Sequence, residues 1–426
     1  MKAFAYHYGA TGVAWYRIWQ IVKYLKLRNV DIKRLPNESD RINIPLAKGQ
    51  SNWPGVRNHV EIAEEHDVII SQYHSVRSNV FRLLGQAEKA KLIVDIDDDI
   101  YSIHPSNANY ASWLPQDDSY EELQDGEENS ADIQARVKNL EGVIHEAEGK
   151  KYFFKPGENR RENVEMLLQH AHMVTVSTPE LARIYSKLNA NIVVIPNGVD
   201  FDLWKPIDND TGKFRIGMTG SNTHVLDWFE ANEGIKQFLE EHPDSVLVMN
   251  CVLNMVDGFA GERFDKSDFA IPRIPAYFEK LFKEGRIMFR KPSEVEDYPK
   301  WLAENKFDVI LAPLSDITFN KSKSNIKYLE ASALKIPFIG QDMEPYNRDV
   351  KHGVNGLLCK APADWYKRIK FVYENRKEAR TLANRAWMDV KNRYDMALLA
   401  EKYEHMLNNF VTEVEHETPD RQPAFA

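Results

Sequence analysis

The chain has 426 residues and only two cysteines, and this scarcity limits the kinds of protein it can be. Cys251 and Cys359 lie far apart, and neither has another cysteine nearby. A disulfide framework needs several paired cysteines, and a cysteine-rich zinc site needs a cluster of them. The sequence therefore excludes both, and we expect a reducing, cytoplasmic setting.

Long apolar runs are also absent. No stretch reaches the roughly 18 consecutive apolar residues that a transmembrane helix requires, so we expect no membrane-spanning segment. The first eight residues, MKAFAYHY, are too polar for a signal peptide.

An excess of positive charge is missing as well. The chain carries 55 basic and 64 acidic residues, a formal charge of −9, which argues against unselective nucleic-acid binding but leaves a local basic groove open. Residues 117–132 include eight acidic side chains and no Lys or Arg, a composition typical of a solvated or mobile segment. With 43% hydrophobic residues, the chain is able to form two or three domains with sizeable cores.

Apolar strand patterns alternate with amphipathic helix patterns along the chain. Such alternation predicts parallel sheets covered by helices on both faces. The clearest helix runs from about residue 14 to 28. In the first half we predict strands at residues 2–8, 68–72, 92–95, 173–177 and 192–196. In the second half we predict strands at residues 214–218, 246–250, 287–290, 309–312 and 337–339.

Turn-forming residues at 195–200 and a polar stretch at 207–213 divide the two halves. We therefore predict an N-terminal Rossmann-like domain over residues 1–200, with an insertion at about 105–160 that interrupts the alternation. A second Rossmann-like domain is predicted over residues 201–390. Residues 391–426 are expected to form a C-terminal helix and a flexible tail.

Two glycine-containing loops follow the first predicted strand of each half. In open α/β sheets, ligands bind beyond the carboxyl ends of the strands, and backbone N–H groups at a helix start attract phosphate. Gly12 in the first loop, and Gly220, Ser221 and His224 in the second, are therefore candidate phosphate-site residues. Ordinary turns between strand and helix would look the same.

The most informative segment covers residues 308–340. A predicted strand is followed by a loop rich in hydrogen-bond donors, and a helix opens near Asn325 with Ser324 as its expected N-cap. Lys327 and Glu330 are three residues apart and so share a helix face. A lysine there suits a diphosphate, and a carboxylate one turn later suits ribose hydroxyls. A capped helix with a surface Lys–Glu pair would explain the helix but not the donor-rich loop.

Residues 176–206, VSTPELARIYSKLNANIVVIPNGVDFDLWKP, resemble the interdomain passage of retaining GT-B glycosyltransferases of the GT4 type. Residues 352–358, HGVNGLL, are similar to that family's G.NGLL turn, and residues 12–25 resemble the opening of a divergent phage or bacterial branch. The resemblance implies two Rossmann-like domains facing each other across a cleft. It also implies transfer of a sugar from a nucleotide-diphosphate sugar with retention of configuration, without a cofactor or an essential divalent metal.

The resemblance is incomplete at the donor site. The family's second glutamate falls on Glu330, which is expected to bind the ribose, but the first falls on Ser322. The usual carboxylate contact to the donor sugar is therefore either absent or replaced by Asn320 or Lys323. The Arg and Lys pair expected after the first strand of the second domain is also absent. We move the role of that pair to Lys323, Lys327 and the Gly220–Ser221 backbone. The loops, the start of the helix and the resemblance together give this candidate donor-binding set: Gly12, Gly220, Ser221, Asn320, Lys323, Ser324, Asn325, Lys327 and Glu330.

The run Asp95-Ile-Asp97-Asp98-Asp99 contains the Asp-x-Asp pattern of metal-dependent GT-A transferases, but those are single-domain enzymes and we predict no metal ligands. Asp95 ends a predicted strand and is a candidate base. Asp97 and Asp98, together with His74, are candidates for binding the acceptor. His224 and Lys327 are candidates for assisting departure of the nucleotide. Helix capping or simple solvation would also explain the aspartates.

The sequence leaves the acceptor open among a DNA base, a glycan, a lipid and a protein, and it leaves the oligomeric state open. The resemblance to a phage branch suggests transfer to hydroxymethylated DNA bases in the host cytoplasm as an alternative. A basic strip containing Arg77, Arg82, Lys89, Lys91, Arg160 and Arg161 would favour it. A second alternative is an inactive module that binds sugar nucleotides, because the first glutamate is missing.

Overall fold

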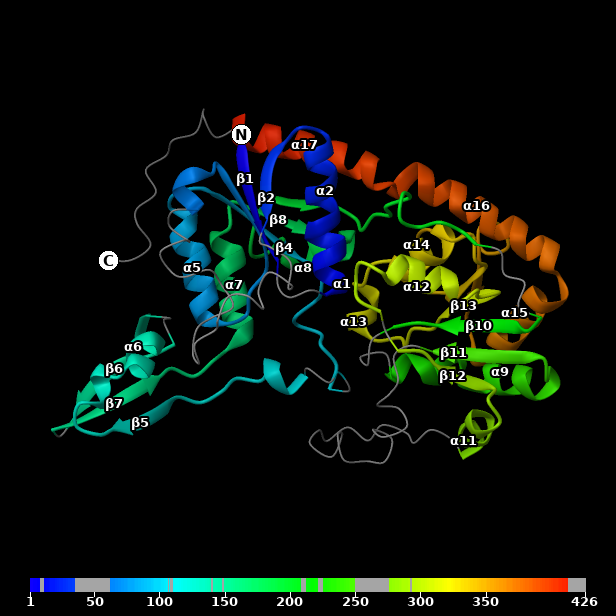
Figure 1. Ribbon diagram of the computed structural model, residues 1–426, viewed down its shortest axis with the longest axis horizontal. Coiled ribbons are helices and arrows are strands. Elements are labelled where there is room, and N and C mark those ends of the chain that lie inside the picture. Colours follow the sequence, from blue (N-terminus) through cyan, green and yellow to red (C-terminus); the bar gives the residue numbers. More distant parts are fainter. Residues whose placement is uncertain are drawn as a thin grey trace.

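The computed structural model describes residues 1–7, 11–34, 62–105, 107, 110–138, 141–147, 149–207, 212–220, 225–249, 276–291 and 293–412. The described residues form two parallel sheets covered by helices and a smaller antiparallel sheet (Figure 1). No helix in these ranges is long and apolar enough to cross a membrane.

The N-terminal sheet has the strand order β2-β1-β3-β4-β8-β9, with every pair parallel. Its strands are β1 Lys2–Tyr6, β2 Asp31–Arg34, β3 Val68–Gln72, β4 Lys91–Ile96, β8 Met173–Val176 and β9 Ile192–Val194. The covering helices include α5 Arg77–Ala87, α7 Arg160–His170 and α8 Pro179–Tyr185. All residues of β3 and β8 are buried, because helices cover both faces of a parallel sheet.

The first helical segment begins with a capped turn and then widens. Thr11 caps α1 (Gly12–Ala14) by accepting a hydrogen bond from the Ala14 N–H at 3.2 Å. A π-helical segment, Trp15–Trp19, follows, and α2 continues over Gln20–Leu27. The predicted helix is confirmed in extent, but its π turn was not predicted. Single π turns are rare and often mark functional sites.

The C-terminal sheet has the order β12-β11-β10-β13-β14-β15, again all parallel. Its strands are β10 Phe214–Met218, β11 Ser245–Met249, β12 Ile287–Phe289, β13 Val309–Ala312, β14 Phe338–Gln341 and β15 Leu357–Cys359. Its helices are α9 Val225–Glu241, α11 Ala276–Lys283, α12 Tyr298–Glu304, α13 Thr318–Lys321, α14 Ile326–Ala333, α15 Pro362–Glu374 and α16 Arg376–Tyr394. Two apolar clusters, one on each face of the sheet, form its core.

The small sheet projects from the N-terminal domain (Figure 1). It consists of β5 Ser119–Leu123, β6 Val143–Ala147 and β7 Lys150–Lys155 in the order β5-β7-β6, with α6 Ala131–Lys138. Its carboxylates are exposed, as expected of a solvated segment, but part of the acidic block is a strand. Ion pairs explain why these charged residues form a strand: Glu122 lies 2.7 Å from Lys150, and Glu121 lies 2.7 Å from Arg136.

The last helix returns to the N-terminal domain. α16 runs along the C-terminal domain, and α17 Met396–Thr412 crosses to pack against α2 (Figure 1). The crossing is tied to the interdomain passage, because the Val199 N–H donates to the Tyr394 carbonyl at 2.8 Å. A side chain at Gly198 would begin 2.4 Å from the Met396 sulfur, so a larger residue there would have to displace the Met396 and Leu399 side chains of α17.

Candidate active site at the facing edges of the sheets

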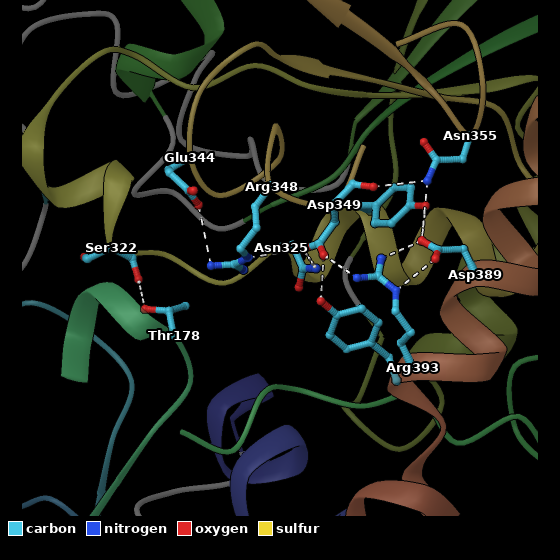
Figure 2. A network of polar contacts seen from close by, with 11 residues as sticks. Thr178, Ser322, Asn325, Glu344, Arg348, Asp349, Asn355, Asp389 and Arg393 are labelled. Atoms are coloured by element: carbon cyan, nitrogen blue, oxygen red, sulfur yellow. Dashed lines mark hydrogen bonds and ion pairs between the residues drawn. The ribbon is translucent and has the colours of Figure 1, made fainter. Parts of the chain in front are cut away.

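Hydrogen bonds between described residues join the two domains beyond the carboxyl ends of their strands. The Thr178 hydroxyl at the start of α8 donates to the Ser322 carbonyl at 2.9 Å (Figure 2). The Asn197 amide donates to the Ser324 hydroxyl at 2.9 Å, and the Tyr16 hydroxyl donates to Glu330 at 3.0 Å. The loop after β13 and the first turns of α14 therefore contact the N-terminal domain, at the sheet edge where α/β proteins bind ligands.

Glu330 is the centre of this contact. Its side chain is only 4% exposed and accepts hydrogen bonds from both domains. Tyr16 reaches Oε1, while Lys327 Nζ lies 2.8 Å and the Tyr298 hydroxyl 3.3 Å from Oε2. The predicted pairing of Lys327 with Glu330 on one helix face is confirmed. The pair is not a surface pair, because the Lys327 side chain is 18% exposed.

The surroundings keep Lys327 charged and the phenols neutral. Burial disfavours the ammonium, but the Glu330 carboxylate and the Tyr298 hydroxyl together outweigh this effect and raise the pKa of Lys327. Burial, reinforced by the charge of Glu330, raises the pKa of Tyr298 and raises that of Tyr16 well above its ordinary value. Glu330 thus binds one cation and two phenol donors. A ligand hydroxyl that binds this carboxylate has to compete with them.

The start of α14 differs from the prediction. The prediction that Ser324 caps this helix is wrong: Asn325 occupies the N-cap position, and the Ser324 hydroxyl accepts from Asn197 instead. The Asn325 side chain is buried and donates to Asp349 at 2.7 Å. Asp349 also accepts from Arg393 at 2.8 Å (Figure 2). Asp349 therefore links the first turn of α14 to Arg393 on α16 and holds that turn in place.

The turn at residues 352–358 belongs to the same network. The Asn355 side chain accepts from the Lys351 N–H at 2.6 Å and donates to the Asp349 carbonyl at 3.1 Å. Asp389 on α16 accepts two hydrogen bonds from Arg393, at 2.6 and 2.8 Å (Figure 2). These residues position α14, and with it Lys327 and Glu330. Sequence reasoning missed Asp349, Asp389 and Arg393, because they are distant in sequence and match no motif.

The donor-rich loop is largely shaped by its own contacts. Asn320 is buried, and its amide donates to Asp227 at 2.8 Å and to the Ser315 carbonyl at 3.0 Å. Lys323 is half-buried, with its ammonium 4.9 Å from the centre of the Phe319 ring. Its charge also acts on Asp98, where it opposes the rise in pKa that burial causes. Lys323 is thus a cation of this loop whose charge acts on the aspartate run.

The aspartates of the run have different environments. Asp95 accepts from Arg17 at 2.6 and 2.9 Å and from Thr175 at 2.7 Å, and both members of its ion pair are almost fully buried. This pairing favours a structural role. Asp97 and Asp98 are half-buried. Burial raises the pKa of both carboxyls, and that of Asp97 rises well above its ordinary value because Asp98 and Asp95 are close.

The other candidates lie around this centre or outside the described part. His74 is buried after β3, Gly12 is exposed in the first turn of α1, and Gly220 follows β10. Ser221 and His224 lie outside the described residues. Within the part that the structure describes, no three His, Cys, Asp or Glu side chains gather as metal ligands would.

The basic strip suggested for DNA binding is interrupted. Arg82 is buried beside Asn79, at 3.1 Å, and burial lowers its pKa. Arg77 donates to the Gly157 carbonyl at 3.0 Å. These two cations therefore do not form an exposed strip.

Two tyrosines of the site escaped prediction. Tyr16 lies in the π segment, and Tyr298 is the first residue of α12, distant from every motif. Arg17 was also missed, but the sequence contains a signal for it. It is a charged residue among the apolar side chains Trp15, Ile18 and Trp19, and a charge buried there requires a partner.

No protein-family model and no curated protein sequence matches the chain. Solved structures do resemble it. HepE from Anabaena, with UDP and glucose, has a TM-score of 0.59 and 14% identity over 96% of this chain and 99% of that one. A glycosyltransferase from Rickettsia africae has a TM-score of 0.57 and 14% identity, over 98% and 99%. Sucrose-phosphate synthase from Thermosynechococcus elongatus has a TM-score of 0.55 and 12% identity, over 97% and 100%.

At this level of identity the likeness concerns the fold. The matched structures are GT-B glycosyltransferases that align over nearly their whole length, and the two parallel sheets of this chain are Rossmann-like. The predicted fold class is thus confirmed: the chain has the GT-B fold, with two Rossmann-like domains facing each other.

Proposed function

We propose that the chain is a glycosyltransferase that takes a sugar from a nucleotide-diphosphate donor. The observation that carries the proposal is the Lys327–Glu330 pair on the first turns of α14, at the contact between the domains. The HepE structures with the same fold were solved with UDP-glucose, or with UDP and glucose. A half-buried cation beside a buried carboxylate suits the two polar parts of such a nucleotide, its diphosphate and its ribose.

Each residue of the pair has a proposed role. Lys327, helped by Lys323 and by the amides at the start of α14, neutralises the charge that grows on the departing diphosphate. Glu330 accepts hydrogen bonds from the ribose once Tyr16 or Tyr298 releases it. Gly12, Gly220 and Ser221 complete the phosphate site, and His224 assists departure of the nucleotide.

The proposed reaction retains the configuration of the sugar. Asp95 is bound by Arg17 and Thr175, so the proton of the acceptor passes to the departing phosphate and not to this carboxylate. Asp97 and Asp98 are half-buried and lie beyond the end of β4, where they bind the acceptor together with His74. The acceptor itself stays open among a glycan, a lipid, a protein and a DNA base.

Melting curves with UDP, GDP, ADP and CMP, and with the corresponding sugar nucleotides, test the proposal. A nucleotide at about 100 times its dissociation constant stabilises the protein by about 2.7 kcal/mol. We expect one nucleotide to stabilise the chain, and its sugar nucleotide to be hydrolysed or used for transfer. Stabilisation without any turnover would instead identify an inactive binding module. Stabilisation by no nucleotide would contradict the proposal.

The same assay in EDTA tests the absence of a metal requirement. We expect turnover to persist, because Lys327 and Lys323 supply the positive charge that a divalent ion would otherwise provide. Loss of turnover that Mn²⁺ or Mg²⁺ restores would make Asp97 and Asp98 metal ligands.

A further inference from the structure

Tyr346, in the loop that follows β14, is a buried tyrosine whose hydroxyl has no hydrogen-bond partner among the described residues. The residue is only 3% exposed, and its loop begins at the carboxyl-end edge of the C-terminal sheet, where Lys327 and Glu330 also lie. Most buried polar groups in folded proteins are paired. An unpaired hydroxyl at the sheet edge where α/β proteins bind ligands is therefore a candidate ligand contact.

The ring of Tyr346 is held by packing and by its own backbone. It packs edge-on against the Phe338 ring, with ring centres 5.2 Å apart, in the apolar cluster on that face of the sheet. The Tyr346 N–H donates to the Met343 carbonyl at 2.9 Å, and its carbonyl accepts from the Val350 N–H at 2.8 Å. A group fixed in this way needs little reordering when a ligand enters, which favours binding.

The loop that carries Tyr346 also holds the start of α14. The Asp349 side chain accepts from Asn325, the N-cap residue of α14, at 2.7 Å. The Asp349 N–H in turn donates to the Tyr346 carbonyl at 3.0 Å. The position of Tyr346 is thus tied by hydrogen bonds to the first turn of α14, which carries Lys327.

The charges of the proposed site act on the Tyr346 phenol. Burial raises the pKa of Tyr346, the Lys327 ammonium opposes this rise, and the Asp227 and Glu330 carboxylates reinforce it. Lys327 has the largest effect of the three charges. Because the pKa is raised, the phenol stays protonated at neutral pH and can donate a hydrogen bond.

Tyr328 shows how a tyrosine of the same apolar cluster satisfies its hydroxyl within the protein. Its ring also packs edge-on against Phe338, with ring centres 5.4 Å apart, and its hydroxyl donates to Asp389 at 3.2 Å. A core residue at position 346 needs no hydroxyl, since phenylalanine would fill the same space without a polar group to withdraw from water. The hydroxyl of Tyr346 is thus better explained by a ligand than by packing.

We propose that the Tyr346 hydroxyl donates a hydrogen bond to the diphosphate of the donor nucleotide, beside the Lys327 ammonium, and so makes the site select diphosphates over monophosphates. This inference rests on the proposed function and adds a residue to the donor site. Glu330, the proposed ribose ligand, affects the pKa of Tyr346 less than Lys327 does, so the hydroxyl belongs to the phosphate end of the nucleotide. A monophosphate ends at the phosphate attached to the ribose and leaves Tyr346 without a partner.

Titration calorimetry tests the proposal with two ligands: the nucleoside diphosphate that stabilises the unchanged protein most in the melting curves (UDP, GDP or ADP) and its monophosphate. Tyr346→Phe removes the hydroxyl and keeps the ring. We expect this variant to bind the diphosphate about 5- to 10-fold more weakly, and the monophosphate with an affinity changed by less than about twofold. Without ligand it should melt at the temperature of the unchanged protein or higher, because an unpaired hydroxyl is removed.

Tyr328→Phe is the matched control. It removes a hydroxyl from a ring of the same cluster, and Asp389 keeps its two hydrogen bonds from Arg393. This variant should bind both nucleotides like the unchanged protein. An unchanged diphosphate affinity in Tyr346→Phe, or an equal loss for both nucleotides, would overturn the inference and leave the proposed function intact. If the unchanged protein binds no nucleoside diphosphate, the proposed function is wrong and the inference with it.

Discussion

Lys327 occupies the second position of α14, where the helix dipole disfavours a cation. From this argument alone, Lys327→Ala should leave the free protein as stable or slightly more stable. The structure reverses that expectation, because the variant would remove the cation that Glu330 binds at 2.8 Å. We now expect a loss of about 1–3 kcal/mol in the free energy of unfolding, together with a strong fall in kcat/KM.

Chemical denaturation and steady-state kinetics measure the two effects of Lys327→Ala separately. Lys327→Arg is the control: it keeps the charge and should recover stability more fully than activity, because the guanidinium is larger and planar. An unchanged kcat/KM in the less stable Lys327→Ala protein would assign the residue a structural role only.

Tyr16 holds Glu330 from the opposite domain and so competes with a ribose for the same oxygen. Tyr16→Phe removes the hydroxyl that donates to Glu330 Oε1 at 3.0 Å and keeps the ring in its apolar cluster. We expect the affinity for the preferred nucleotide to rise by about 5- to 10-fold, because one acceptor atom becomes free. Titration calorimetry measures it.

Tyr298→Phe is the matched control for Tyr16→Phe. Its hydroxyl donates to the other oxygen, Oε2, at 3.3 Å, and Lys327 still binds that oxygen when the hydroxyl is gone. A smaller gain in affinity is therefore expected. Weaker nucleotide binding by Tyr16→Phe would mean that Tyr16 orients Glu330 for the ligand.

Asp97 makes stability depend on pH. Burial and the charges of Asp98 and Asp95 raise the pKa of Asp97 well above its ordinary value, so the folded state favours the protonated form. Ionisation in the folded protein is therefore unfavourable at neutral pH, and this cost disappears as the pH falls below the unfolded pKa of about 4. Asp97→Asn should melt higher than the unchanged protein at pH 7, and the difference should shrink toward pH 4.

Melting curves across this pH range test the Asp97 prediction. Asp125→Asn, in the exposed acidic block, is the control, and it should show no such trend. A stabilisation by Asp97→Asn that is the same at every pH would show that its cause is not ionisation.

At the scale of elements, apolar strands were predictable from the sequence and charged strands were not. Each strand predicted in the two large sheets exists, with ends that differ by two residues at most, because buried parallel strands are continuous apolar runs. Strand β2 was missed because charged residues interrupt it, and β15, of three residues, was interpreted as part of the HGVNGLL turn. Strand β5 was missed because its charged residues conceal it, and its ion pairs with β7 and α6 appear only in the folded chain.

The small sheet should be separable from the rest of the N-terminal domain. It has its own apolar cluster of Leu123, Ile133 and Phe153, and its two connections meet where the Gln116 N–H donates to the Glu158 carbonyl at 3.0 Å. Replacing residues 117–157 with a short Gly-Ser linker should therefore leave nucleotide binding unchanged. Titration of the shortened protein checks this. A loss of nucleotide affinity would mean that the small sheet contributes to the donor site.

At the scale of the whole molecule, α17 is the element by which the end of the chain stabilises its beginning. Leu399 is 2% exposed in the cluster that α17 forms with α2 and the N-terminal sheet. Leu399→Ala should lower the free energy of unfolding by about 2–4 kcal/mol. The neighbouring Leu398 is 41% exposed, so Leu398→Ala should change it by no more than about 0.5 kcal/mol. Equal losses in the free energy of unfolding for the two variants, measured by denaturant titration, would contradict the packing of α17 against the N-terminal domain.

The sequence by itself determined the two sets of alternating strands and helices and the Lys327–Glu330 pair, because these depend on local patterns: buried strands, helix periodicity and a spacing of three residues. Only the tertiary structure decided what surrounds that pair. Tyr16, Tyr298 and the network of Asp349 and Arg393 come from segments up to 314 residues apart, and no local pattern records such contacts. For the same reason the sequence did not show Arg17 as the partner of Asp95, since their ion pair forms only when the strand and helix pack together.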